Sequence, residues 1–480
     1  MPRRTKIIAT LGPATDKPGV LERCIVEGVD LVRLNFSHGT AADHERRILQ
    51  VREYAKQQGR EVGVLADLQG PKIRISTFEK DAIELMAGDV FVLDAKLAPK
   101  KGNQHSVGID YKDLPRDVSV GDKLLLDDGR LVFSVEKIND EKIHCRVEVG
   151  GSLSNNKGIN RLGGGLSAPA LTDKDKADLI TAIKLGVDYI AISFPRSAED
   201  VLYAKKLIQD AKGRAGVIAK IERTEAVSVI DDIIRVSDAV MVARGDLGVE
   251  IGDAELPIVQ KHIIQRARSL DKAVITATQM MESMVENAIP TRAEVFDVAN
   301  AVLDGTDAVM LSAETASGAH PDKVVAAMAR ICIGAEKQRM AQVSGHRVEC
   351  HFNRVDELIA MSTMYAANHF NVKAIAALTE SGSTPLWMSR IRSGIPIYAL
   401  TRHVATERRM TLYRGVYPVH FDPLVAKASE LYKQTLEQLK KCGVVQSGDW
   451  VIITRGDSLG VHGQTNTMKI LQVDNISAEG

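Results

Sequence analysis

Short apolar runs bounded by turn residues recur between residues 6 and 315, and eight of them are strand-like. They are KIIATLG from residue 6, VDLVRLNFSHG from 29, GVLADLQG from 63, DYIAISFPRS from 188, GVIAKIE from 216, AVMVARGDLG from 239, AVITATQM from 273 and AVMLSAET from 308. Helical patterns such as ADHERRILQVREYAKQQG separate most of them and are long enough to cross back to a parallel strand. Eight strands alternating with helices predict an α/β fold, a (β/α)8 TIM barrel.

Two parts of the chain depart from this alternation. Residues 71 to about 170 have strand and turn patterns with hardly any helical pattern, which predicts an all-β domain inserted in a barrel loop. After about residue 345, strands and helices alternate on a smaller scale, as in an α/β domain with a roughly five-stranded sheet. We therefore expect a barrel at 1–69 and 171–345, an inserted β-barrel domain at 70–170, and a C-terminal α/β domain at 346–480.

The overall composition narrows the functional class. Lys plus Arg and Asp plus Glu both total 62, and aromatic residues are only 4% of the chain, so a nucleic-acid partner is not expected. Five cysteines without a CxxC spacing favour a reducing compartment. No segment approaches the ~20 apolar residues that span a bilayer. The sequence therefore predicts a soluble, cytoplasmic protein that does not bind membranes.

Polar residues gather where the predicted strands end, and in a barrel the C-terminal strand ends form the active face. The candidates are Arg33, Asn35, Ser37 and His38, then Asp67, Lys220 and Glu222, Arg244 and Asp246, Thr278, and finally Ser312 and Glu314. For any single one of them a salt bridge or a loop cap is the simpler explanation. Their coincidence at six strand ends favours an active face.

Two of these acids suggest a metal site. Glu222 and Asp246 end adjacent strands, and Mg²⁺ commonly takes one or two protein carboxylates together with water and substrate oxygens. Pairing of either acid with an arginine, Arg244 or Arg223, stays open as an alternative. Three cations, Arg33, Arg74 and Lys220, would favour a phosphate-bearing ligand, and Gly245 would let backbone amides approach it. Together these features indicate phosphoryl transfer.

The motifs that carry these residues resemble those of the pyruvate kinase family, over essentially the whole chain. RLNFSHG, DLQGPKIR, AKIER, ARGDLGVE, ATQMMESM and LSAET follow that family's order. The resemblance implies transfer of a phosphoryl group from phosphoenolpyruvate to ADP, giving pyruvate and ATP, the last step of glycolysis. It also implies a requirement for Mg²⁺, with Mn²⁺ as an alternative ion, a catalytic barrel, an inserted lid and an allosteric C-terminal domain.

The resemblance also assigns roles to individual residues. Glu222 and Asp246 would hold Mg²⁺, and Lys220 would neutralise charge on the transferred phosphoryl group. The Thr278 hydroxyl, with the amides near Gly245 and Asp246, would seat the substrate carboxylate, and Thr278 would lie near the face where the enolate of pyruvate is protonated. Arg33 and Arg74 would act on the phosphates as catalytic residues.

Further assignments concern the nucleotide, the lid and the effector. The nucleotide would meet Pro13, Asn35, His38, Arg74 and Lys157. The lid would turn Asp128, Lys157 and Asn160 toward the closed site. An effector, either a phosphorylated sugar or a nucleoside monophosphate, would bind Thr379, Ser381, Gly382, Ser383 and Thr384, near RGDSLG at 455–460. An ordinary Ser/Thr-capped turn is the alternative at 379–384. The family resemblance further implies a homotetramer.

One position, Lys72, departs from the pattern common in this family. Many members have a glutamate there and need K⁺, held by groups that match Asn35, Ser37, Asp67 and the carbonyl of Leu68. A lysine supplies its own ammonium charge in much the same region. We therefore expect that Lys72 replaces K⁺ and makes the enzyme independent of it, although a solvated lysine on a hinge turn is the alternative.

Two other functions remain in competition with phosphoryl transfer. A metal-dependent aldolase or lyase that works through a pyruvate enolate would use a similar barrel, but it would need neither a lid insertion nor paired arginines for a nucleotide. A metabolite sensor without catalysis would keep the C-terminal domain, but it would not need Lys220, Glu222, Asp246 and Thr278.

Overall fold

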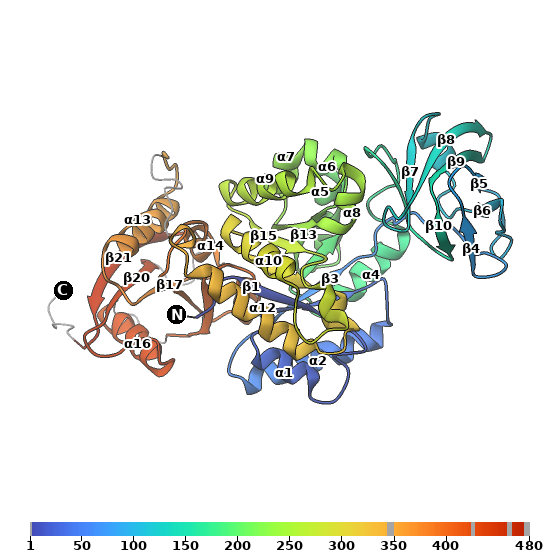
Figure 1. Ribbon diagram of the computed structural model, residues 1–480. Coiled ribbons are helices and arrows are strands. Elements are labelled where there is room, and N and C mark those ends of the chain that lie inside the picture. The colour runs from blue at the N-terminus through green and yellow to red at the C-terminus, as the bar shows by residue number, and fades with distance from the viewer. Residues whose placement is uncertain (1, 343–349, 424–427, 458–462, 475–480) are drawn as a thin grey trace.

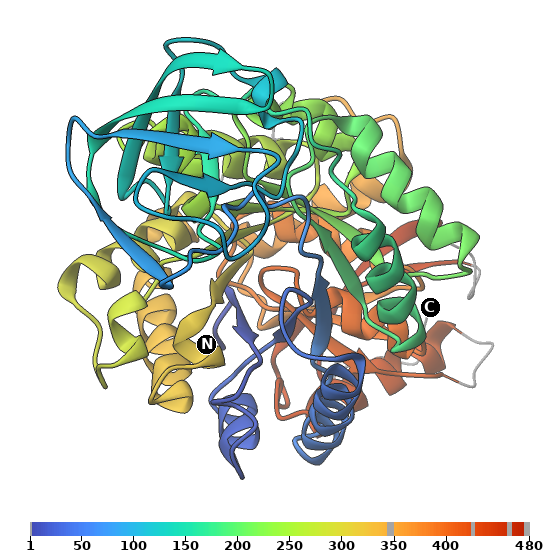
Figure 2. The same ribbon diagram turned by 90° about the vertical axis from the view of Figure 1, so that its right-hand side faces the viewer.

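The computed structural model describes residues 2–342, 350–423, 428–457 and 463–474. Figure 1 shows three lobes in a row, with the barrel between the C-terminal domain and the inserted domain. Figure 2, turned so that the inserted domain faces the viewer, shows its sheets in front of part of the barrel. In the described residues, no helix is both long and apolar enough to cross a membrane.

The barrel confirms the predicted fold class. It closes in the order β1-β16-β15-β14-β13-β12-β3-β2, and all neighbouring strands are parallel. Its strands are β1 (Lys6–Thr10), β2 (Leu31–Asn35), β3 (Gly63–Asp67), β12 (Tyr189–Ile192), β13 (Gly216–Ile221), β14 (Ala239–Ala243), β15 (Ala273–Ala277) and β16 (Ala308–Leu311). Most of them are buried along their whole length, as expected for parallel strands covered on both faces.

Helices surround the barrel strands on the outside. They are α1 (Val20–Val26), α2 (Ala41–Gln57), α4 (Asp173–Lys184), α5 (Ala198–Asp210), α6 (Thr224–Ser228), α7 (Ile230–Val236), α8 (Arg244–Ile251), α9 (Leu256–Ser269), α10 (Arg292–Asp304), α11 (Ala313–Ala316) and α12 (Pro321–Glu336). Two short 3-10 turns, η1 (Glu282–Val285) and η2 (Arg339–Ala341), complete this part. Capping boxes at Thr40, Thr172 and Thr291 begin α2, α4 and α10, because each threonine accepts the third helical amide.

The inserted domain consists almost entirely of sheet. Its strands form a six-stranded sheet, β11-β7-β8-β9-β5-β6, and a two-stranded sheet, β10-β4. Their bounds are β4 (Ala82–Leu85), β5 (Val90–Asp94), β6 (Ser106–Gly108), β7 (Lys123–Leu126), β8 (Leu131–Asn139), β9 (Lys142–Val149), β10 (Gly151–Ser154) and β11 (Ile159–Arg161), with one short helix, α3 (Leu114–Asp117). The domain has its own apolar core, which includes Phe91 and Phe133 in ring contact.

The C-terminal domain is a five-stranded α/β sheet in the order β19-β18-β17-β20-β21, of which only the edge strand β21 is antiparallel. The strands are β17 (Ala374–Leu378), β18 (Ile397–Thr401), β19 (Val416–His420), β20 (Trp450–Gly456) and β21 (Thr465–Gln472). The helices are α13 (Val355–His369), α14 (Ser383–Arg390), α15 (Val404–Met410) and α16 (Ala428–Lys441). The borders proposed for the three domains agree with this division but stay a prediction.

The C-terminal domain closes the N-terminal end of the barrel. One apolar cluster runs from the barrel interior, including Ile8 and Leu65, into the C-terminal domain at Met364 and Met388. At its edge Arg390 is paired with Asp307, and both side chains are only 1% exposed. Because this end is filled, the opposite end of the barrel, where the strands terminate, is the one left for a ligand.

Candidate active site

The strand register brings most of the expected residues together at the C-terminal end of the barrel. Asn35 is paired in register with Asp67, and Thr10 with Arg33. The neighbouring strands β13 and β14 end at Ile221 and Ala243, so the residues that follow them emerge side by side.

Lys220 is the centre of an ion cluster at the C-terminal end of the barrel, which we call the barrel mouth. Its ammonium lies 2.8 Å from Glu222 Oε1 and 3.3 Å from Asp67 Oδ1, and it donates a 2.7 Å hydrogen bond to Ser193 Oγ. Arg33 closes the other side of Asp67, with its Nε 2.7 Å from Oδ2. Asp67 is 1% exposed, so these two cations balance a carboxylate that is almost withdrawn from water.

The pKa values of these groups follow from that balance. Burial alone would lower the pKa of Lys220, but the carboxylates of Asp67 and Glu222 outweigh it and hold the pKa above its usual value. Burial alone would raise the pKa of Asp67, but Lys220 and Arg33 reverse the effect and lower it. Lys220 therefore stays a cation across the physiological range, which is the state needed to stabilise a phosphoryl group in transfer.

Glu222 and Asp246 fit a divalent metal ion. Burial is the main cause that raises the pKa of Glu222, and the negative charge of Asp246 raises it further. A positive charge between Glu222 and Asp246, in addition to that of Lys220, would offset their mutual repulsion and favour the charged form of Glu222. Within the described residues no group of three or more acidic, histidine or cysteine side chains is arranged for a metal, so further ligands would be water and substrate oxygens, as Mg²⁺ accepts.

Thr278 lies in a strained turn directly after β15. Its φ is 66° and that of Gln279 is 52°, and positive values are rare for a β-branched residue. Arg244 stabilises the turn by donating to the carbonyl oxygen of Thr278 at 2.7 Å, and it is itself paired with Asp297. Strain of this kind persists only where the surrounding structure enforces it, often at functional sites.

The Thr278 hydroxyl is close to the start of α8. It accepts the backbone N–H of Gly245 at 2.8 Å and donates to the carbonyl of Ala277. A Cβ placed on Gly245 would lie 3.7 Å from Thr278 Oγ1, which is an ordinary contact. The protein alone therefore does not require glycine there, and the absence of a side chain leaves space beside this amide.

Lys72 does not occupy the pocket expected for a monovalent cation. Its ammonium lies 3.0 Å from Asp246 Oδ1 and 3.9 Å from Asp128 Oδ1. In the expected pocket, Asn35 accepts the N–H of Ser37, and the carbonyl of Leu68 accepts the Ser193 hydroxyl. Lys72 thus reaches the expected metal site, whereas Arg33 and Lys220 supply the positive charge at Asp67.

The expected nucleotide residues are divided between barrel and insertion. Pro13 and His38 are exposed on loops of the barrel. Arg74 donates to the carbonyl of Asn156 at 2.9 Å, and Lys157 pairs with Asp127 at 2.8 Å, so both are held by the inserted domain. Arg33 and Arg74 are therefore attached to different domains, and a common ligand would have to join them.

The two remaining lid residues differ from each other. Asp128 is 70% exposed, and its recorded charged partner is Lys72. Asn160 is buried and contacts the carboxyl group of Glu250, on the barrel side of the hinge. Asp128 is therefore exposed beside Lys72, whereas Asn160 helps to attach the insertion to the barrel.

Sequence reasoning missed three residues of this region. Ser193 and Phe194 follow β12, and their positions could have been found, because DYIAISFPRS was recognised as a strand although no site residue was assigned to it. The N–H of Phe194, whose φ is 58°, donates to Glu222 Oε2 at 2.9 Å. Glu250, in α8, could not have been found, because its importance depends on burial against the insertion.

The expected effector loop lies between β17 and α14. Gly382 has a φ of 84° and donates its N–H to Thr379 Oγ1, while the hydroxyls of Ser381 and Ser383 are 2.9 Å apart. Thr384 reaches Thr465 on β21. β17 and β20 are neighbours in the sheet, but the chain continues from β17 to β18 on one side and from β20 to β21 on the other. Ligands commonly bind at such a topological switch point. Of RGDSLG, residues 458–460 lie outside the described residues.

Comparison with known proteins identifies two matching family models. One describes the barrel domain of pyruvate kinase and matches residues 2–325, and the other describes the alpha/beta domain of pyruvate kinase and matches residues 357–471. Together they cover both the barrel and the C-terminal sheet.

Individual relatives are similar over nearly the whole chain. The chain is 58% identical to pyruvate kinase II of Salmonella typhimurium and 55% identical to a pyruvate kinase of Haemophilus influenzae, in each case over 98% of this chain and 99% of the relative. A crystal structure of a pyruvate kinase from Cryptosporidium parvum is similar with a TM-score of 0.90 at 35% identity, covering 98% of this chain and 96% of that one.

The buried hinge carboxyl group gives a first testable prediction. Burial raises the pKa of Glu250 to about 7, so the folded chain binds this proton more tightly than the unfolded chain. The protonated group is fully stabilising below about pH 4.5 and loses its contribution as the pH rises toward about 7. The free energy of unfolding of the wild type should therefore fall by up to ~3 kcal/mol over this window because of Glu250. Glu250→Gln, which cannot titrate, should not show this fall.

The measurement is the thermal unfolding midpoint between about pH 5 and 8, because the two ends lie on either side of the raised pKa. The wild-type midpoint should fall with pH relative to that of Glu250→Gln. The exposed neighbour Glu255→Gln should follow the wild type. Parallel curves for the wild type and Glu250→Gln would contradict the prediction.

Proposed function

Because the chain belongs to the pyruvate kinase family, we propose that the barrel mouth transfers the phosphoryl group of phosphoenolpyruvate to ADP through the residues described above. The reaction forms pyruvate and ATP and requires a divalent metal ion, typically Mg²⁺. The observation that carries the residue assignment is the position of Lys220, a buried cation between Asp67 and Glu222, one strand away from Asp246.

We propose that Glu222 and Asp246 hold the metal ion, which when bound supplies positive charge to the phosphate and carboxylate oxygens of the substrates. Lys220 would then meet the transferred group from its side of the barrel. In the structure Lys72 is paired with Oδ1 of Asp246, so Lys72 and the metal ion would share this carboxylate. Arg33 and Arg74, with Pro13, Asn35, His38 and Lys157, would receive the nucleotide once the insertion closes over the mouth and excludes water.

After phosphoryl transfer the enolate of pyruvate must gain a proton. The Thr278 hydroxyl lies beside the amide of Gly245, where the substrate carboxylate would be seated. A hydroxyl is a weak acid, so it would relay a proton from water and also position the enolate. The strained backbone of Thr278 supports this role, because it fixes the direction of the hydroxyl at some cost in energy.

Independence of K⁺ is a separate part of the proposal. The ammonium of Lys72 brings a fixed positive charge to the acids of the mouth, and Arg33 and Lys220 already balance Asp67. A monovalent ion near Asn35, Ser37, Asp67 and Leu68 would therefore have little uncompensated charge to offset.

Regulation and assembly complete the proposal. An effector that bears a phosphate would bind the loop from Thr379 to Thr384, because the hydroxyls of Ser381 and Ser383 lie together there at the start of α14, at the switch point of the sheet. The resemblance to the family further supports a homotetramer, and the unpaired cysteines support a cytoplasmic location.

The role of Thr278 is tested by separating the two chemical steps. Thr278→Ala should slow enolpyruvate protonation at least ~10-fold more than it slows ATP formation, because positioned proton donors contribute ~10²- to 10⁴-fold. ATP formation is followed in single turnovers, and protonation by the incorporation of solvent deuterium into pyruvate. Thr278→Ser should retain the step, and the helix-surface variant Thr181→Ala should behave as the wild type. Equal loss of both steps would sink the assignment.

The role of Lys72 is tested by measuring the reaction rate in a buffer whose monovalent cation is a bulky organic one, with and without KCl. Addition of KCl should change the wild-type rate less than about 3-fold, because the charge is already supplied by the side chain. Lys72→Glu should need KCl, because a third acid joins Asp246 and Asp128, whereas Lys80→Glu on the exposed surface of the insertion should not. Activation of the wild type by orders of magnitude would refute the proposal.

The effector loop is tested with a panel of phosphorylated sugars and nucleoside monophosphates. At least one should shift the half-saturating concentration of phosphoenolpyruvate at least ~5-fold, the lower range of allosteric coupling. The double variant Ser383→Ala, Thr384→Ala should lose the shift. Ser447→Ala, at the opposite end of β20, should retain it. Saturation curves that ignore the whole panel would count against regulation at this loop.

A further inference from the structure

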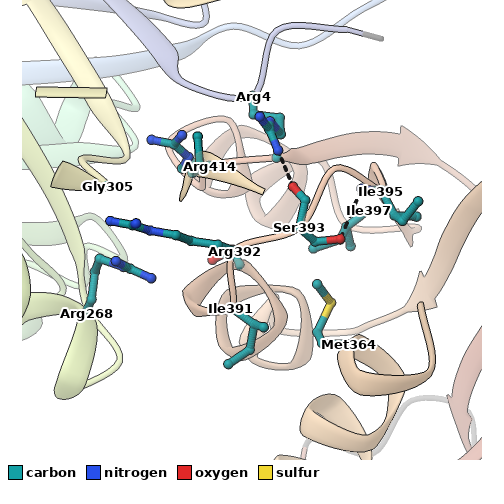
Figure 3. A pocket seen from close by; sticks show the side chains of 13 residues that line it. Arg4, Arg268, Gly305, Met364, Ile391, Arg392, Ser393, Ile395, Ile397 and Arg414 are labelled. Carbon is teal, nitrogen blue, oxygen red and sulfur yellow. Dashed lines mark hydrogen bonds between the residues drawn. The ribbon is translucent and has the colours of Figure 1, made fainter. Parts of the chain in front are cut away.

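Five arginines gather where the C-terminal domain meets the base of the barrel. They come from separate parts of the chain and are Arg4, Arg268, Arg390, Arg392 and Arg414. Four of them, all except Arg390, line one small hollow together with Ser389, Ser393 and Gly305. Figure 3 shows the guanidinium ends of Arg268, Arg392 and Arg414 on the same side of this hollow, near Gly305.

Only two of these arginines have a carboxylate partner among the described residues. Arg390 pairs with Asp307, and Arg4 lies 3.6 Å from Glu336. Both acids are also occupied by other donors: Glu336 accepts the amide of Thr5, and Asp307 accepts the amides of Val274 and Arg414. The two negative charges therefore offset two of the five positive charges.

The other three guanidinium groups donate to carbonyl oxygens. Arg268 donates to Arg390 at 2.8 Å across the domain boundary. Arg392 donates to Leu303 at 2.8 Å, and Arg414 to Thr306 at 2.9 Å, at the C-terminal end of α10. That helix end carries a partial negative charge of only about half a unit. Among the residues that the structure describes, no carboxylate lies within ion-pair distance of Arg268, Arg392 or Arg414.

The pKa of Arg268 agrees with an excess of positive charge around this side chain. Burial is the main cause that lowers the pKa of Arg268, and repulsion from Arg392, Arg390 and Arg414 lowers it further, to about 9. Burial also lowers the pKa of Arg392 and of Arg414, although Asp304 acts to raise the first and Glu336 the second. Guanidinium groups keep their proton in proteins, so the repulsion is a cost of the folded state that an anion would relieve.

We propose that this hollow is a binding site for a dianionic oxyanion of the phosphate class, held by Arg268, Arg392 and Arg414. Planar guanidinium groups recognise phosphate oxygens with paired hydrogen bonds, and three of them around one hollow match a tetrahedral anion. The site is separate from the barrel mouth and from the loop at Thr379–Thr384.

Such a ligand would join two domains. Arg268 belongs to α9 of the barrel, whereas Arg392 and Arg414 belong to the C-terminal domain. A bound anion that contacts both sides favours the docked arrangement over any arrangement that separates them, and stabilises the folded chain in proportion to its occupancy. The source of the anion is either free phosphate or a phosphate ester, and both share the group that the arginines recognise.

The first experiment counts phosphate sites. Equilibrium dialysis of the full chain with radiolabelled inorganic phosphate, at constant ionic strength in chloride, measures the equivalents bound. Arg268→Gln and Arg392→Gln should each lose one equivalent relative to the wild type, and the surface variant Arg235→Gln should lose none. The double variant Ser383→Ala, Thr384→Ala should keep this equivalent. Unchanged stoichiometry in both Arg268→Gln and Arg392→Gln would overturn the proposal.

A second measurement needs no variant, which matters because these arginines also attach the domains. Phenylglyoxal labels arginines, and peptide mass spectrometry reports each position in the wild-type protein. Inorganic phosphate should protect Arg268, Arg392 and Arg414 and leave Arg235 unprotected, whereas chloride should protect none of them. Phenyl phosphate in place of phosphate tests an ester: protection by both probes supports a site for esters and free phosphate, and protection by phosphate alone supports a site for the free anion. Protection by neither overturns the proposal.

Discussion

The charge balance around Lys220 is the constraint on which the barrel mouth depends. Two acids, Asp67 and Glu222, are withdrawn from water within ion-pair distance of one ammonium group, and Arg33 holds Asp67 from the other side. Removal of one member would leave a buried charge without its partner, which typically costs several kcal/mol, about 3 to 5. The same cluster that stabilises the strand ends therefore also keeps a positive charge fixed at the point where a phosphoryl group would pass.

Strand patterns and strand-end residues predicted much of this arrangement. The eight runs were correct because parallel barrel strands are buried on both faces, so their composition alone distinguishes them. Arg33, Asp67, Lys220 and Glu222 meet as expected, because strand register brings their positions together. The partner of Lys72 could not be predicted, because a long flexible side chain that follows a hinge has several acids within reach. Arg74 likewise depends on how the insertion is attached, which no local pattern encodes.

The C-terminal domain has a sheet of its own, but it also packs against the interior of the barrel. Its apolar residues continue the interior cluster of the barrel, and Tyr189 inside the barrel donates to the carbonyl of Arg409 at 2.7 Å. The arginines at this boundary were not found from the sequence, because they come from four separate segments and only the fold brings them together. Arg390 and Asp307 pair at the edge of this shared apolar cluster, so the domain is attached to the barrel by both apolar and ionic contacts.

Closure of the barrel also sets the order in which the chain can be completed during synthesis. β1 is hydrogen-bonded to β16, with Lys6 opposite Ala308. At a translation rate of ~5–20 residues per second, the first strand leaves the ribosome roughly 15 to 60 s before its last neighbour is made. The inserted sheet, with a core of its own, is complete long before then. Until β16 is made, β1 lacks this neighbour, and the apolar edge that it leaves unpaired is a place where chaperones or premature association would act.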